Sequence, residues 1–304
     1  MPTDTKKLAV VAAALSSDPR VAPARSRELG FDGLLFDAYS SALNVPDLSG
    51  SGRKEFRQLL SARDQQLVGL RWDTGPKGLA PGADVDQAIA RLDRVMEAAA
   101  GLASPLVCVD LGALPQPPRQ PKPKPQVTQK QAGLILLPGA GDIGKPGAAL
   151  SEAPSAPPDP AFVSQVDGAL AELGRRADRY SVVLAFRSEL SSLAALDRAL
   201  RQSGCHWFGV DLDAVSVLRD EWDLDQTFSQ LGHLIRHARA RDATRGADRR
   251  TRPAAVGKGD TDWGHLLSNL DAAGYVGWIT IDPLELPDRL AAAAAARKYL
   301  ISQA

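Results

Sequence analysis

The chain has 304 residues, and its 36 lysines and arginines balance its 36 acidic residues, so the formal net charge is zero. This length is enough for one large barrel or two ordinary domains with a sizeable core. A zero net charge argues against a nucleic-acid-binding protein that works by neutralising phosphates.

The two cysteines, Cys108 and Cys205, have no metal-like spacing and are expected to be buried thiols in a reducing compartment. The apolar run over residues 8–15 is too short to cross a bilayer. We therefore expect a cytoplasmic protein with no membrane partner.

Short apolar strands alternate with amphipathic helices along the chain. Strands are predicted over residues 8–15, 34–37, 67–72, 105–111, 181–187, 206–213, 233–239 and 276–281. Helices are predicted over residues 19–29, 53–66, 84–101, 161–178, 190–203, 214–231 (with a break near Trp222), 263–270 and 286–301. Residues 241–253 read as a basic, irregular loop. Eight strands alternating with helices predict an α/β fold, a closed (β/α)8 or TIM barrel.

Regularity breaks in the middle of the chain, where 12 of the 22 prolines lie between Pro115 and Pro160. Proline lacks an amide donor and fixes its backbone angle, so the ends of this segment should be extended or disordered. The apolar stretch 132–139 between them is a candidate extra strand. We interpret residues 115–160 as an insertion after strand 4 of a single domain spanning 1–304, serving as a spacer or as a lid or docking arm.

Polar side chains gather at the carboxyl ends of the predicted strands. Residues two apart on a strand share a face, so taking Asp282 as inward marks the following set: Asp37, Arg71, Asp73, Asp110, Arg187, Asp211, Asp213, His237, Arg239 and Asp282. Charges are expensive in a strand core unless they are paired. The set therefore indicates a site, or a charge cluster that neutralises itself.

Two stretches resemble the xylose isomerase-like TIM barrels, the sugar phosphate isomerase/epimerase group. Residues 24–37 read A-R-S-R-E-L-G-F-D-G-L-L-F-D, and residues 257–282 combine a glycine-bracketed loop, a helix and the strand G-Y-V-G-W-I-T-I-D. The resemblance implies a barrel that binds a small carbohydrate or sugar phosphate at its C-terminal face.

The resemblance also implies a divalent metal held at the ends of strands 5, 6, 7 and 8. In this chain those positions are Arg187, Asp213, Arg239 and Asp282. A guanidinium has no lone pair for a metal. We therefore predict no cofactor, and an arginine network on Asp213, Asp282 or Asp211 in the metal's place. The alternative register keeps zinc, manganese or magnesium, and it uses the following ligands: Asp213, His237, Asp282 and Glu189.

Two functions remain open. In an isomerase or epimerase, the catalytic residues would be Asp213 or Asp282 as base and His237 as a general acid or base. The substrate would be held by the following side chains: Arg187, Arg239, Arg71, Asp37, Asp211 and Trp278. The alternative is a non-catalytic binding protein in which the arginines hold an anionic sugar or a partner segment, and a homo-oligomer remains open. The related endonucleases need several metals and many histidines. This chain has 4 histidines, which argues against the endonuclease class.

Overall fold

The computed structural model describes residues 6–117, 157–248 and 250–303. Most of the predicted insertion, including the candidate strand at 132–139, lies outside the described residues.

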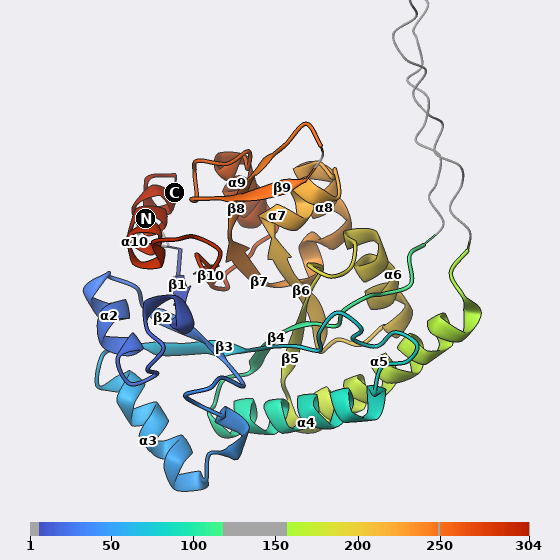
Figure 1. The fold of residues 1–304 in the computed structure, drawn as a ribbon, viewed down its shortest axis with the longest axis horizontal. Coiled ribbons are helices and arrows are strands. Elements are labelled where there is room, and N and C mark those ends of the chain that lie inside the picture. The colour runs from blue at the N-terminus through green and yellow to red at the C-terminus, as the bar shows by residue number, and fades with distance from the viewer. Residues whose placement is uncertain (1–5, 118–156, 249, 304) are drawn as a thin grey trace, which may run out of the picture.

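Eight parallel strands close into one barrel, in the order β1-β10-β7-β6-β5-β4-β3-β2 (Figure 1). Their bounds are β1 Leu8–Val11, β2 Gly33–Asp37, β3 Gln66–Asp73, β4 Leu106–Asp110, β5 Val183–Arg187, β6 Phe208–Asp213, β7 Ile235–Ala240 and β10 Ile279–Ile281. The first and last barrel strands close the ring by pairing Leu8 with Ile279 and Val10 with Ile281. The predicted TIM barrel is confirmed.

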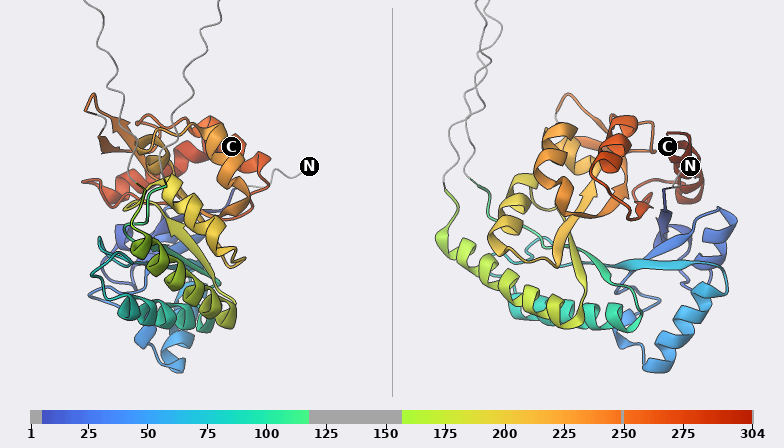
Figure 2. Two further views of the ribbon diagram at one scale, coloured as in Figure 1. Left: turned by 90° about the vertical axis from the view of Figure 1, so that its right-hand side faces the viewer. Right: turned by 180° about the vertical axis from the view of Figure 1, so that it is seen from behind.

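Helices surround the strands on the outside, which Figure 2 shows from two further sides. Their bounds are α1 Ala12–Leu15, α2 Ala22–Glu28, α3 Gly50–Ser61, α4 Val85–Gly101, α5 Pro160–Tyr180, α6 Leu193–Ser203, α7 Ala214–Arg219, α8 Leu224–Leu231, α9 Trp263–Ala272 and α10 Arg289–Ser302, with short 3-10 helices η1 Val45–Asp47 and η2 Gly232–Leu234. None of the helices in the described parts of the chain combines the length and apolar character needed to cross a membrane.

The structure differs from the prediction in several segments. The first strand ends at Val11, and the remaining Ala-Ala-Ala-Leu forms α1 because alanine has the highest helix propensity. The next helix begins at Ala22, later than predicted. The basic segment is no irregular loop: it forms an antiparallel hairpin of β8 (Asp242–Arg245) and β9 (Thr251–Ala254) that packs against α7.

The barrel interior is divided between an apolar and a polar half. Small apolar side chains from β1, β2, β4 and β5 fill one half, and they include Ala9, Leu35, Cys108 and Ala185. On β6, β7 and β10 the inward residues are polar, and this half contains the pair Asp211–His237. Because side chains alternate along parallel strands, every second residue of both halves points to the barrel axis. The inward polar residues of β6, β7 and β10 continue up to the barrel mouth.

Candidate functional site

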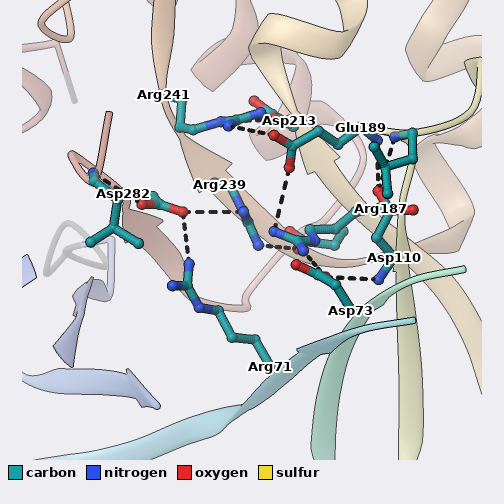
Figure 3. Close-up of polar contacts among 12 residues, drawn as sticks. Arg71, Asp73, Asp110, Arg187, Glu189, Asp213, Arg239, Arg241 and Asp282 are labelled. Carbon is teal, nitrogen blue, oxygen red and sulfur yellow. Dashed lines mark hydrogen bonds and ion pairs between the residues drawn. The ribbon is translucent and has the colours of Figure 1, made fainter. Parts of the chain in front are cut away.

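A cleft of about 310 Å³ opens at the carboxyl ends of the barrel strands. Its walls carry four arginines, which Figure 3 shows with their carboxylate partners: Arg71, Arg187, Arg239 and Arg241. Arg71, Arg187 and Arg239 lie near the carboxyl ends of β3, β5 and β7. Arg241 follows Arg239 by two residues, so the barrel geometry itself brings the four charges together. The cleft is therefore the candidate site.

Asp282, directly after β10, joins two of these arginines. Its Oδ2 accepts hydrogen bonds from Arg239 and from Arg71, both at 3.1 Å. Arg239 also donates to Asp211 at 3.0 Å, and Arg71 donates to Asp37 at the end of β2. Burial raises the pKa of Asp282, but the charges of Arg239 and Arg71 outweigh it and hold that pKa below the usual range. The predicted contacts of Arg239 with aspartates are confirmed.

Arg241 follows β7 and forks onto Asp213. Its Nε donates to Asp213 Oδ2 at 3.0 Å, and its Nη2 donates to the same oxygen. Its Nη1 lies 3.3 Å from Glu189 and 3.4 Å from Glu285. Asp213 uses its other oxygen to cap α7, through the backbone N–H of Val215. The predicted catalytic Asp213 is thus only 3% exposed, and it lies behind Arg241 and off the cleft wall.

Arg187, at the end of β5, pairs differently from the prediction. Its Nη2 donates to Asp73 at the end of β3, and its Nη1 lies 3.7 Å from Glu189. Burial, together with the neighbouring charge of Arg239, lowers the pKa of Arg187 to about 9. Of the four arginines, this one has the weakest countercharge.

The loop after β5 is fixed from two sides, and this fixes Glu189. The buried carboxylate of Asp110 accepts hydrogen bonds from the backbone N–H of Glu189 at 3.0 Å and of Leu190 at 3.1 Å. From the other side, Arg219 donates to the carbonyl oxygens of Ser188 and Glu189 at 2.6 and 2.7 Å. Glu189 is therefore held at the cleft wall by its backbone, and its side chain faces Arg241 and Arg187.

Beneath the arginines lies a closed polar layer. His237 Nδ1 is 2.6 Å from Asp211 Oδ1, and its Nε2 is 2.7 Å from Thr280 Oγ1. His237 is fully buried and Asp211 is 2% exposed. The predicted roles of His237 as a catalytic residue and Asp211 as a substrate ligand are corrected, because both lie below the cleft. Asp211 contacts Arg239 directly, and His237 contacts Asp211.

Trp278 is also corrected as a substrate ligand. It precedes β10 at the amino-terminal end of the barrel, where its ring lies near Gly33 and packs against the apolar cluster that includes Val68. The ammonium of Lys7 is 5.9 Å from the ring centroid. The aromatic residues at the cleft are Tyr39 and Trp72, which form an edge-to-face pair with centroids 6.1 Å apart.

Sequence reasoning missed Arg241 as a site residue, because it was assigned to the basic loop. The signal was present: Arg241 continues the inward series His237, Arg239 by two residues. Glu189 was considered only as an alternative metal ligand.

The strand-end positions that the family resemblance assigns to a metal do not fit one here. Arg187 and Arg239 fill two of them, and a guanidinium cannot coordinate a cation. The remaining carboxylates, Asp213 and Asp282, accept their hydrogen bonds from Arg241, Arg239 and Arg71. A divalent ion at this point would face cations at short range.

The alternative ligands are also engaged. His237 has both ring nitrogens in hydrogen bonds, and Glu189 faces arginines. Within the described residues, one group of three side chains brings potential ligand atoms within 4.8 Å of one another, namely Cys108, Asp211 and His237. Arg239 donates to Asp211 in that group. The group is thus a closed hydrogen-bonded layer already balanced by a cation.

Solved structures share this architecture at low identity. A xylose isomerase domain protein from Planctomyces limnophilus superposes with a TM-score of 0.70 at 13% identity, covering 98% of this chain and 96% of its own. A D-psicose 3-epimerase from Clostridium cellulolyticum H10, solved with D-tagatose, gives 0.69 at 14%, covering 97% and 98%. A xylose isomerase-like TIM barrel protein from Mycobacterium smegmatis, in complex with magnesium, gives 0.69 at 15%, covering 100% and 98%.

None of the functionally curated proteins matches the sequence significantly. The model of the xylose isomerase-like TIM barrel family matches residues 23–303, and the chain therefore belongs to this family.

Proposed function

We propose that the protein binds a small carbohydrate or sugar phosphate in the cleft at the barrel mouth, with arginines in the place of the family's divalent metal. The observation that carries this proposal is the position of Arg187 and Arg239: both are buried guanidinium groups at strand ends, and both border the cleft. Arginine forks match phosphate and carboxylate geometry and are charged at neutral pH.

The rest of the cleft suits a sugar. Carboxylates on its walls can accept hydroxyl hydrogens, and the faces of Tyr39 and Trp72 supply an apolar wall on the β2–β3 side. Two epimerases of the same fold were solved with free sugars, D-tagatose and D-allulose. A polyhydroxy ligand with one anionic group would use both kinds of wall.

Isomerase or epimerase chemistry is the second candidate, and Glu189 favours it. Such chemistry moves a proton beside a carbonyl, which needs a base at the substrate and a cation near the developing oxyanion. Asp282 is held by two arginines, and Asp213 lies off the cleft. Glu189 is 39% exposed and stands between Arg187 and Arg241. In this candidate Glu189 takes the proton, and Arg187 holds the oxyanion.

A ligand screen tests binding. Ketose and aldose phosphates, each beside its neutral sugar, are added to the purified protein and the melting temperature is measured. We expect at least one sugar or sugar phosphate to raise the melting temperature, because a ligand that binds only the native state stabilises it. The same increase should persist in the presence of a chelator, and metal analysis should find far less than one equivalent of zinc, manganese or magnesium.

Stoichiometric metal, with chelator-sensitive melting, would refute the metal-free proposal. Proton exchange then separates the two candidates: solvent deuterium enters the bound sugar in an enzyme and stays out in a binding protein. Glu189→Gln should abolish such exchange while leaving the ligand-induced increase in melting temperature largely intact.

A further inference from the structure

The four arginines of the mouth differ in how their charge is balanced. Arg239 pairs with Asp211 and Asp282, whose side chains are 0% and 4% exposed, and Arg241 pairs with Asp213, which is 2% exposed. These partners cannot leave without stranding a buried charge. These three ion pairs therefore hold Arg239 and Arg241 in place.

Arg187 is the exception. Its own side chain is 4% exposed, yet its partners are solvent-accessible: Asp73 is 50% exposed and Glu189 is 39% exposed. Its Nε, like that of Arg239, is buried and has no hydrogen-bond partner in the described part of the chain, so the exposure of its partners is what sets Arg187 apart. A buried cation thus depends on two solvent-exposed anions, one of which, Glu189, is shared with Arg241.

Asp73 is poorly anchored apart from this contact. It is the last residue of β3, and its other hydrogen bond comes from the backbone N–H of Asp110 at 3.3 Å. Both contacts use the same oxygen, Oδ1. An oxyanion arriving from the cleft would meet Arg187 where the Asp73 carboxylate now lies, and Asp73 could turn to water at little loss.

We propose that Arg187 is an anion-binding subsite and that Asp73 is its built-in substitute anion, which the phosphate or carboxylate group of a ligand displaces. This inference rests on the proposed function for the identity of the whole ligand, but it concerns the anionic group alone. The lowered pKa of Arg187, caused first by burial and then by Arg239, agrees with a cation whose countercharge is incomplete. An incoming anion completes the countercharge of Arg187.

The test is calorimetric titration of the full chain with inorganic phosphate. Asp73→Asn removes the competing charge and keeps the side-chain shape, so phosphate should bind about two- to fivefold tighter than to the wild type, the range of an exposed ion pair. The matched control is Asp37→Asn, which removes a carboxylate from the end of the neighbouring strand; its arginine, Arg71, keeps Asp282. That control should change phosphate affinity little. Adding Arg187→Gln to Asp73→Asn should abolish the gain.

A second measurement covers the case in which Asp73→Asn does not fold. The buried Nε–H of Arg187 should give a protected side-chain resonance in the wild type, identified by its loss in Arg187→Lys. Phosphate should shift this resonance. An unchanged resonance, or phosphate affinity that Asp73→Asn leaves the same or weakens, would overturn the proposal.

The outcomes also separate this inference from the proposed function. If phosphate shows the expected pattern and no sugar or sugar phosphate binds, the anion subsite stands and the proposed function fails. If sugars bind and Asp73→Asn leaves the affinity for phosphate unchanged, the proposed function stands and the subsite fails.

Discussion

The surroundings of a residue decide what an arginine does at the mouth of this barrel. Arg239 and Arg187 occupy corresponding strand ends and are almost equally buried. Arg239 lies between two buried aspartates, which raises its pKa despite the opposing effect of burial. Arg187 lies between exposed acids, and burial together with the charge of Arg239 lowers its pKa. The same side chain is thus paired with buried carboxylates in one place and with exposed carboxylates in the other.

This difference predicts unequal losses on truncation. Arg239→Ala leaves Asp211 and Asp282 buried without their cation and should lower the free energy of unfolding by roughly 3–5 kcal/mol. Arg187→Ala leaves partners that water can reach and should lower it by only about 1–2 kcal/mol, mainly through lost packing. Urea denaturation followed by circular dichroism measures both, and the two variants remove the same atoms. Equal losses would show that the two arginines are balanced alike.

The sequence predicted several of the residues that meet at the mouth and the aspartate partners of Arg239, but it missed Arg241 and did not predict the partner of Arg187. Alternation along a strand determines the face of a side chain and leaves its reach open. Arg187 pairs with Asp73 across β4, because Asp110, the residue in register with both, turns its carboxylate to backbone N–H groups of neighbouring loops. That preference depends on loops that come together only in the folded chain.

At the scale of elements, one buried carboxylate connects the β8–β9 hairpin to the glycine-bracketed loop before α9. Asp242, the first residue of β8, accepts hydrogen bonds from the backbone N–H of Gly257 at 2.9 Å and Gly259 at 3.1 Å, and from the indole of Trp263 at 3.0 Å. The hairpin begins directly after Arg241. The loop therefore helps to hold one of the four mouth arginines.

A pair of glycine substitutions tests this connection. A Cβ at Gly259 would lie 2.2 Å from Asp242 Oδ1 and 2.6 Å from the carbonyl oxygen of Ala243. Gly259→Ala should therefore push the loop off Asp242 and lower the free energy of unfolding by roughly 1–3 kcal/mol. Gly264→Ala, five residues on in α9, meets nothing closer than 3.6 Å and should raise it by up to about 1 kcal/mol.

Thermal or urea denaturation compares the two alanine variants with the wild type. If Gly259→Ala were as well tolerated as Gly264→Ala, the loop would be free of Asp242. The expected signs are opposite, although the chemical change is identical.

The elements with a strong local pattern were predicted well, and those made by tertiary contact were missed. Seven of the barrel strands lie within a few residues of their predicted bounds, because each is a short apolar run between turn signals. The eighth was predicted four residues too long, since an apolar run reads equally as strand or helix. The hairpin was missed because arginines and Pro253 hide its alternation, and Asp242 stabilises it through residues 15 or more positions away.

At the scale of the molecule, the fold tolerates charge inside the barrel because the charged side chains of one half of the interior pair with one another. The apolar half needs no polar partners. In the polar half the side chains are partners of one another in two layers, with Asp211 and His237 beneath Arg239 and Asp282. Relatives at 13–15% identity keep the same architecture. The barrel architecture thus persists at low sequence identity.

This interior balance predicts how the whole protein responds to acid. Burial raises the pKa values of Asp282 and Asp211, but their arginine partners lower them more, so both pKa values lie below the ordinary value of 3.8. In the acid range the unfolded chain therefore binds more protons than the native protein, and stability must increase with pH. The contribution is complete above the ordinary carboxyl pKa and is lost as pH falls through the lowered ones. Asp110, whose pKa is raised chiefly by burial, opposes this trend only in part.

The free energy of unfolding, measured by urea denaturation at a series of pH values, should be nearly level from pH 7 to about 5 and should fall steeply below about 4. Asp282→Asn removes one of the two lowered carboxyls, so its curve should start lower and fall less steeply. The matched control, Asp271→Asn, removes an exposed carboxylate that pairs with Lys6, and its curve should run parallel to the wild type. Parallel curves for Asp282→Asn and the wild type would mean that the arginines do not hold Asp282 ionised, and the charge balance inside the barrel would have to lie elsewhere.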